Sequence, residues 1–248
     1  MMPIHPSPTH LLIYSLLAKP HKSPSSKMVS RCHEILNLGQ AIEVQINECR
    51  FCMFNLNFEP KALGARYVNG STIVVIVSGH AAIMCSITPC CAGDLLGDRD
   101  AARRNARAKM EEVKGWYDEF KDGFFPTGPH ETHCIVWCSV FELPPSQGGR
   151  DPNTAQGDHV PHPTHPRPSH PGITVAMPHQ IEIIGQVLHE MELEPEFKFY
   201  LFREVPDEQG SRGTILVDGR GMSIEVYMHD RLVHVVETPR QVAQRLLK

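Results

Sequence analysis

Reactive side chains gather in one segment, residues 70–89, which reads GSTIVVIVSGHAAIMCSITP. The candidate catalytic residues of this segment are Thr72, His80, Cys85 and Ser86. A Thr or Ser hydroxyl needs a base before it attacks a carbonyl, whereas a Cys thiol with a pKa of about 8.5 is more easily ionised. Alternation along a strand turns Cys85 away from Ser86, and His80 lies in a turn, far from Thr72. The residue types are therefore suited to nucleophilic chemistry, but their order along the chain is not.

The cysteines carry no clear metal or redox motif. Eight of them are spread irregularly, so reduced thiols are expected. Cys49 and Cys52 form a CxxC pair in strand-like sequence, whereas a thioredoxin-type pair begins a helix. A structural zinc site needs a second ligand pair. Cys90 and Cys91 are adjacent, so one pass of the chain does not easily present both sulfurs to one ion, and we do not favour zinc.

A His/Pro repeat is the remaining candidate metal site. His159, His162 and His165 recur at every third position. A polyproline II helix has about three residues per turn, so these imidazoles would share one side and could bind Zn, Cu or Ni ions weakly. His170 falls out of this register, and a flexible tract with incidental metal affinity is the interpretation we favour. Gly-rich phosphate motifs and the GxSxG motif are absent from the sequence, and we expect no cofactor.

The charge balance argues against functions that need a strongly basic surface. The 248 residues hold 24 Lys and Arg against 28 Asp and Glu, for a net charge of −4, which favours neither nucleic acid nor an anionic membrane. No apolar stretch reaches the roughly 18 residues of a membrane span, and we expect a cytoplasmic protein with a protein partner. Asp218 and Arg220, in a turn beside Asp230 and Arg231, are interpreted as exposed ion pairs.

The composition divides the chain into regions. Residues 1–27 are rich in Pro, Ser and His and are interpreted as a disordered leader or a gene-model extension, with Met28 as the alternative start. Residues 11–17 resemble the apolar part of a signal peptide but lack a preceding basic residue. Residues 28–248 are predicted to form one domain. Within it, residues 144–172 predict a disordered insertion, because they are too long and polar for an ordinary connection.

Runs of alternating or continuous apolar residues predict the strands. They cover residues 42–46, 49–58, 73–77, 81–87, 132–141, 197–205, 214–217, 223–229 and 232–237. The run at 73–77 is apolar on both faces, which is typical of a central strand covered on two sides. A turn at Ser78-Gly79-His80 joins it to the run at 81–87. These two strands are expected to form a buried hairpin at the centre of the fold.

Helical periodicity and capping residues predict the helices. The first covers residues 98–121, with Asp98 as its N-cap. The second begins at Pro178, which suits the first helical position, and ends before Pro195. Thr238 caps a short last helix. The order of elements describes an α+β fold with two main helices packed on mixed β-sheet layers.

Several segments resemble, in their order, the chemoreceptor glutamine deamidase (CheD) family. They are the hairpin GSTIVVIV…AAIMCSITP, the helix ending AKMEEVKGWYDEF, the strand CIVWCSVF, the helix IEIIGQVLHEMEL and the strand pair around RGTILVDGR. The resemblance covers roughly residues 63–236, interrupted by the His/Pro-rich segment. It implies an α/β sandwich in which a Cys after Gly-Ser attacks a glutamine amide, a His on the following strand activates this Cys, and an upstream Thr orients the His.

This sequence departs from that family at all three catalytic positions. Gly70-Ser71 is followed by Thr72 in place of the nucleophilic Cys, and Ser86 stands in place of the His. The orienting Thr would fall near Arg66. The resemblance implies that Thr72 and Ser86 lie side by side, where a thiol and an imidazole would otherwise sit.

Three functions follow from these observations. The first is a catalytically inactive relative of the deamidase fold that binds a protein or a small ligand. The second is an amidohydrolase or deamidase with a relocated nucleophile among the four reactive residues of the hairpin. The third is a metal-binding protein that uses the three histidines of the repeat. The substitutions favour the first.

Overall fold

The computed structural model describes residues 30–54, 59–68, 70–89, 98–128, 131–142, 173–201 and 213–246. The predicted leader and the predicted insertion at 144–172 lie outside these ranges, and so do the three histidines of the repeat.

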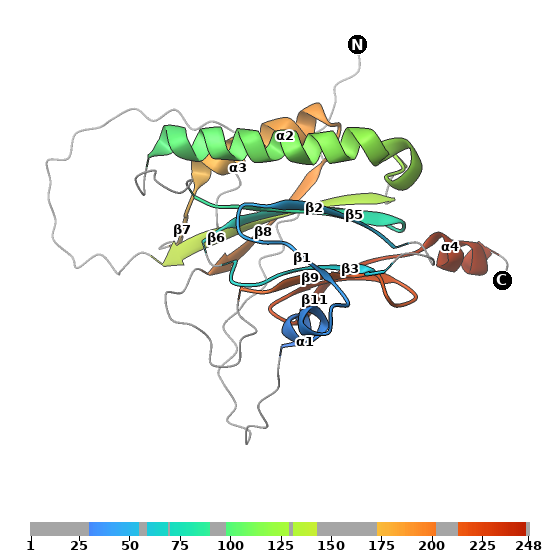
Figure 1. The fold of residues 1–248 in the computed structure, drawn as a ribbon. Coiled ribbons are helices and arrows are strands. Elements are labelled where there is room, and N and C mark those ends of the chain that lie inside the picture. Colours follow the sequence, from blue (N-terminus) through green and yellow to red (C-terminus); the bar gives the residue numbers. More distant parts are fainter. Residues whose placement is uncertain are drawn as a thin grey trace, which may run out of the picture.

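The described part of the chain has four layers (Figure 1). Helices α2 (Arg99–Phe124) and α3 (Pro178–Glu190) cover the outer face of a six-stranded sheet. This sheet packs face to face on a five-stranded sheet, and α1 (Arg31–Asn37) lies on the outer face of the second sheet. Helix α4 (Pro239–Leu246) follows the last strand. The predicted α+β class is confirmed.

Antiparallel pairing dominates both sheets within the described ranges. The six-stranded sheet has the order β2-β5-β4-β6-β7, and β8 also pairs with β6, in parallel. The five-stranded sheet has the order β1-β3-β9-β10-β11, in which β1 and β3 are parallel. The strands are β1 (Ile42–Glu43), β2 (Cys49–Met53), β3 (Ala62–Ala65), β4 (Thr72–Ser78), β5 (Ala81–Ile87), β6 (Thr132–Glu142), β7 (Ile173–Val175), β8 (Pro195–Leu201), β9 (Ile215–Asp218), β10 (Ile224–Met228) and β11 (Arg231–Val236).

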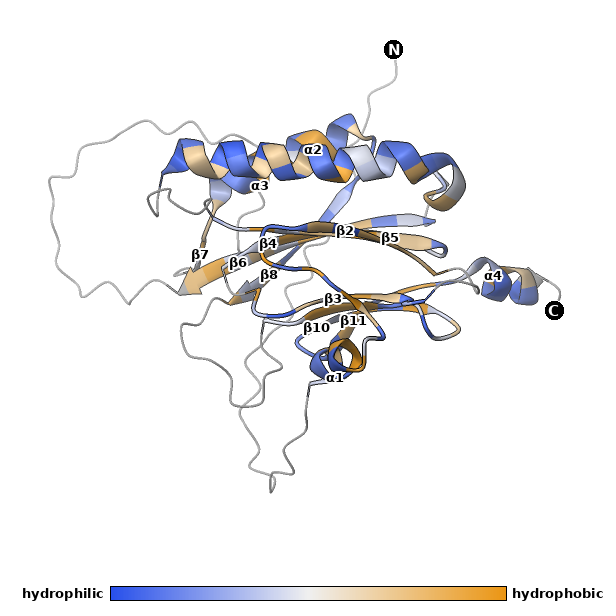
Figure 2. Ribbon diagram, in the orientation of Figure 1, coloured by the Kyte–Doolittle hydropathy of each residue, from blue (hydrophilic) through white to orange (hydrophobic). Residues whose placement is uncertain are grey.

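The hairpin of β4 and β5 lies at the centre of the fold, as predicted. Val74 and Ile76 point toward the helices, whereas Val75 and Val77 point toward the second sheet, and all four are buried. Figure 2 shows the strands largely in apolar colours and the outer helix α2 largely in hydrophilic ones. Each fully buried aliphatic side chain contributes about 1.5–3 kcal/mol, so this hairpin anchors two hydrophobic layers at once.

The predicted helix starts are confirmed. The carboxylate of Asp98 accepts hydrogen bonds from the backbone N–H groups of Asp100 (2.9 Å) and Ala101 (3.1 Å), which caps α2. Pro178 occupies the first turn of α3.

No helix within the described ranges combines the length and apolarity that a membrane crossing requires.

The N-terminal strands differ from the prediction. Strand β1 is only two residues long, and Ile46, expected to face a core, is 57% exposed. Asn47 has a positive φ of 59°, so the chain turns there and β2 joins the other sheet instead of extending β1. Helix α1 and strands β3 and β7 were not predicted.

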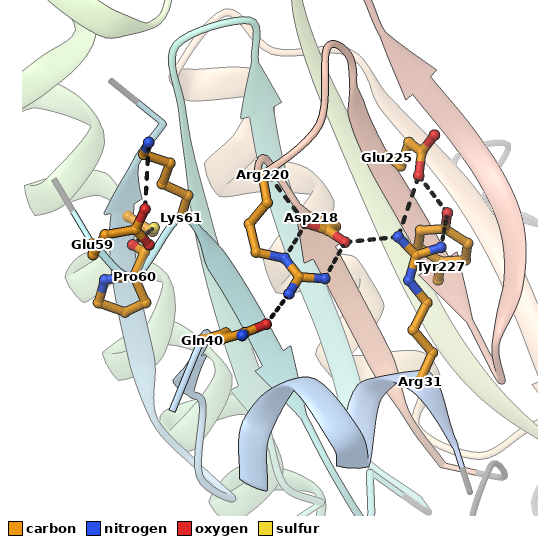
Figure 3. A network of polar contacts seen from close by, with 10 residues as sticks. Arg31, Gln40, Glu59, Pro60, Lys61, Asp218, Arg220, Glu225 and Tyr227 are labelled. Carbon is orange, nitrogen blue, oxygen red and sulfur yellow. Dashed lines mark hydrogen bonds and ion pairs between the residues drawn. The ribbon is translucent and has the colours of Figure 1, made fainter. Parts of the chain in front are cut away.

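Asp218 was expected in an exposed ion pair, but it is only 3% exposed and lies between two arginines (Figure 3). Its carboxylate accepts hydrogen bonds from Arg31 Nη2 (2.8 Å) and Arg220 Nε (2.9 Å). Burial alone would raise the pKa of Asp218, but the hydrogen bonds from Arg220 and Arg31 outweigh it and lower this pKa. Arg31 also stacks on the ring of Tyr227, 4.4 Å from its centroid. The network holds α1 on the second sheet.

We expect Asp218→Asn to lower the free energy of unfolding by about 2 kcal/mol, because it removes charge-assisted hydrogen bonds from a buried site. Since the pKa of Asp218 is lowered by folding, its stabilisation is present above pH of about 4 and is lost as the pH falls below that value. Urea denaturation at neutral and acidic pH measures both effects. Glu119→Gln, an exposed change on α2, is the control, and equal stability of the two variants would contradict the assignment.

Candidate functional site

The pairing register separates Thr72 from Ser86. Thr72 pairs with Ile87, whereas Ser86 pairs with Ile73. Directly opposed residues share a face of the sheet and neighbours along a strand do not, so Thr72 and Ser86 point to opposite faces. The expectation that they lie side by side is wrong, because their positions differ by one residue in register.

Thr72 has a structural role. Its side chain is 1% exposed, and its hydroxyl donates a hydrogen bond to Oε1 of Gln180 (3.3 Å) in α3. The Nε2 group of Gln180 donates in turn to the carbonyl of Thr88 (2.5 Å). This chain of hydrogen bonds ties the start of α3 to the end of the hairpin.

The other candidate residues lie in separate places. Ser86 points toward the second sheet, and its buried Oγ has no hydrogen-bond partner among the described residues. Cys85 points toward the helices. His80 is exposed in the turn, where its carbonyl accepts a hydrogen bond from the backbone N–H of Phe54 (2.8 Å). Arg66 binds the carboxylate of Glu43 with two hydrogen bonds of 2.7 Å. The hairpin thus does not bring its four reactive residues together.

Raised pKa values make several buried thiols poor nucleophiles, namely those of Cys32, Cys52, Cys85, Cys134 and Cys138. A hydrogen bond with Cys49 and burial raise the pKa of Cys85 well above its ordinary value. Burial raises the pKa of Cys32 to about 12 and that of Cys52 to about 12. Burial also raises the pKa values of two thiols in β6, those of Cys134 and Cys138. A protonated, buried thiol packs as a small apolar group.

The two cysteines of the CxxC pair do not converge on one site. Cys49 and Cys52 are three positions apart on β2, and they pack into the helix-facing and sheet-facing layers respectively. Among the described residues, no three His, Cys, Asp or Glu side chains are grouped to hold a metal ion.

A cleft of about 1030 Å³ lies where α2 and α3 end and β6 and β8 begin. Its lining includes the buried apolar side chains of Phe125, Cys134, Met191 and Leu193, called the apolar floor below. Of the described residues that line it, seven carry carboxylates and two are lysines, Lys114 and Lys121. The carboxylates belong to Asp118, Asp122, Glu131, Glu190, Glu192, Glu194 and Glu196.

Few of these carboxylates are neutralised. Asp118 pairs with Lys121 (3.3 Å) and Glu196 with Lys198 (3.2 Å). Within the described ranges, no ion pair reaches Asp122, Glu192 or Glu194. Both helices also end here, and a helix C-terminus carries a partial negative charge. The cleft, called the acidic cleft below, therefore attracts cations.

Glu192 is held in a strained conformation at the rim of the acidic cleft. It follows the C-cap of α3 with a positive φ of 60°. The N–H of Glu192 donates to the carbonyl of His189 (3.0 Å), and the N–H of Leu193 donates to that of Leu188 (2.9 Å). These bonds form a Schellman motif, in which glycine is the preferred residue at this position. A glutamate here costs about 1 kcal/mol, and backbone strain of this kind clusters at functional sites.

Sequence reasoning missed the acidic cleft. Part of it was visible, because the segment HEMELEPEF alternates Glu with other residues at positions 190, 192, 194 and 196. The other carboxylates come from α2 and from the connection to β6, which only the fold brings to the same place.

A histidine pair joins the two sheets beside the acidic cleft. The rings of His133, which lines the cleft, and His234 in β11 are edge to face, with centroids 4.5 Å apart. Burial lowers the pKa of His234 to about 4, and electrostatic repulsion by His133 and Lys198 adds to this effect against the attraction of Glu196. His234 is therefore neutral at pH 7.

The chain matches no model of a known protein family and no curated protein. The resemblance to the deamidase family stays a prediction from the order of elements.

The stability of the fold should decrease as the pH falls from about 6.5 toward 4. In this range an unfolded His234 binds a proton and the folded one, with a pKa of about 4, does not. His234→Phe keeps a ring against His133 and should remove part of this dependence. Urea midpoints at pH 7 and 5 measure it, and identical pH profiles for the variant and the unchanged protein would contradict the assignment.

Proposed function

We propose that this chain is a non-catalytic binding protein whose acidic cleft takes a basic segment of a protein partner. The observation that carries the proposal is the excess of carboxylates around an apolar floor, at the ends of two helices. Lys and Arg side chains combine an aliphatic stem with a cationic head. The floor can cover the stems while the rim carboxylates meet the heads.

The strain at Glu192 supports the same proposal. Glycine at this position would relieve the strain of the left-handed backbone conformation, but it would remove a carboxylate from the rim of the acidic cleft. Glu192 therefore lowers stability while adding a carboxylate to the cleft, and strain of this kind clusters at functional sites.

The alternative enzyme with a relocated nucleophile has less support. Its best thiol, Cys85, is fully buried, and its pKa is raised well above the ordinary value. The hydroxyl of Thr72 is already bonded to Gln180, and the exposed imidazole of His80 lies in the turn at the other end of the strand. The third alternative depends on His159, His162 and His165, which lie outside the described residues.

Alkylation separates the binding protein from the thiol enzyme. We expect iodoacetamide at neutral pH to label Cys85 only as slowly as its burial allows, because a thiol with a raised pKa carries little thiolate. Peptide mass spectrometry of the folded and the urea-unfolded protein gives the two rates. Rapid, selective labelling of Cys85 in the folded protein would favour the enzyme and contradict the proposal.

Binding to the acidic cleft is tested with a short peptide of Lys and Leu residues by isothermal titration calorimetry. We expect binding at low salt that weakens as salt rises, and no binding of a matched Glu and Leu peptide. Glu194→Gln should weaken binding about 2- to 5-fold, as expected for one partly exposed charge. Glu111→Gln, an exposed change on α2 outside the cleft, should leave the affinity unchanged.

Glu192→Gly distinguishes a binding role from a folding role. We expect this variant to bind the Lys and Leu peptide more weakly and to be no less stable, with a gain of about 1 kcal/mol from relief of the left-handed conformation. Calorimetry and urea denaturation of the same sample give both values. Unchanged affinity, or equal binding of the Glu and Leu peptide, would overturn the proposed function.

A further inference from the structure

Two buried cysteines face each other across neighbouring strands. Cys49 of β2 is directly opposite Cys85 of β5 in the antiparallel register. Both are reduced, and they are 8% and 0% exposed. Both belong to the hydrophobic layer between the six-stranded sheet and the helices.

The hydrogen bonds on either side define the type of this pair. The N–H of Ser86 donates to the carbonyl of Glu48 (2.9 Å), and the N–H of Phe54 donates to the carbonyl of His80 (2.8 Å). Hydrogen-bonded pairs therefore fall at the even-numbered residues of β2 and its flanks, such as Glu48 and Phe54. Because Cys49 is odd-numbered, it forms a non-hydrogen-bonded pair with Cys85. In such pairs the Cα atoms are about 4.5 Å apart, which lies within the range that a disulfide spans.

The other described cysteines lack this arrangement. Cys52, the partner suggested by the CxxC spacing, points into the layer between the two sheets. Cys32 belongs to α1 and packs against the second sheet. Cys134 and Cys138 lie on β6, which is separated from β5 by β4.

We propose that Cys49 and Cys85 form a reversible cross-strand disulfide when the protein meets a peroxide. Cys49 is the entry point, because it is the more exposed of the two and lies on β2, the last strand of the six-stranded sheet in the described chain.

The reaction balances with hydrogen peroxide as the oxidant. The Cys49 thiolate attacks one peroxide oxygen, the O–O bond breaks, and a sulfenic acid and hydroxide form. The Cys85 thiol, directly opposite, loses its proton as its sulfur attacks the sulfenic sulfur, so that the S–S bond forms as the S–O bond breaks and hydroxide leaves. The two protons released by the thiols convert both hydroxides to water. Two thiols are oxidised and one peroxide is reduced.

The disulfide would join β2 to the central hairpin and close the chain between residues 49 and 85 into a loop. Because a cross-link restricts the unfolded chain, we expect oxidation to lower the unfolding equilibrium constant by roughly 30- to 1000-fold, the range typical of a native disulfide.

The test uses the full chain with Cys90→Ser and Cys91→Ser, since these two residues lie outside the described ranges. The folded protein is treated with hydrogen peroxide, blocked with an alkylating agent and digested without reduction. We expect a mass lower by two hydrogens, a peptide pair linked through Cys49 and Cys85, and reversal by dithiothreitol. The urea midpoint should rise on oxidation and return on reduction.

Single variants in that background decide the assignment. Cys49→Ser and Cys85→Ser should each abolish the loss of two hydrogens, whereas Cys52→Ser, the matched control on the same strand, should keep it. Addition of oxygen without a disulfide, a link between any other cysteines, or a link that survives Cys85→Ser would overturn the proposal.

Discussion

The alternation of side chains along β4 is the constraint on which the rest of the structure depends. Every residue of β4 and β5 is buried, so both faces of the hairpin need a cover. Val74 and Ile76 require α2 and α3 on one side, and Val75 and Val77 require the second sheet on the other. A slip of one residue in the pairing would exchange the two faces of the strand. The helices and the second sheet would then each face the wrong set of side chains.

The same constraint decides what chemistry the hairpin can do. Thr72 and Ser86 are close in the pairing but fall on opposite faces, one bonded to Gln180 and the other directed to the second sheet. The thiols of Cys85 and Cys134 fill an apolar layer, and their pKa values are raised. Seven carboxylates that the chain need not bury lie at the helix ends, and they line the acidic cleft.

Local signals in the sequence were enough for the elements with strong patterns. The hairpin, the cap at Asp98 and the helix start at Pro178 follow from apolar runs and capping chemistry within a few residues. Helix α1 has only seven residues and no side-chain cap, so it depends on contacts such as Arg31 with Asp218, 187 positions away. Pairings of distant segments were also hidden: CxxC spacing points Cys49 to Cys52, whereas the register between β2 and β5 gives it Cys85.

Methyl nuclear Overhauser effects from the valines of β4 test the central claim most directly. The account predicts that Val74 contacts methyl groups of the helix-facing layer, such as those of Ile184, and that Val75 contacts methyl groups of the second sheet, such as those of Val217. Contacts from Val74 to Val217, or from Val75 to Ile184, would show the opposite register and contradict the account of both the layers and the reactive residues.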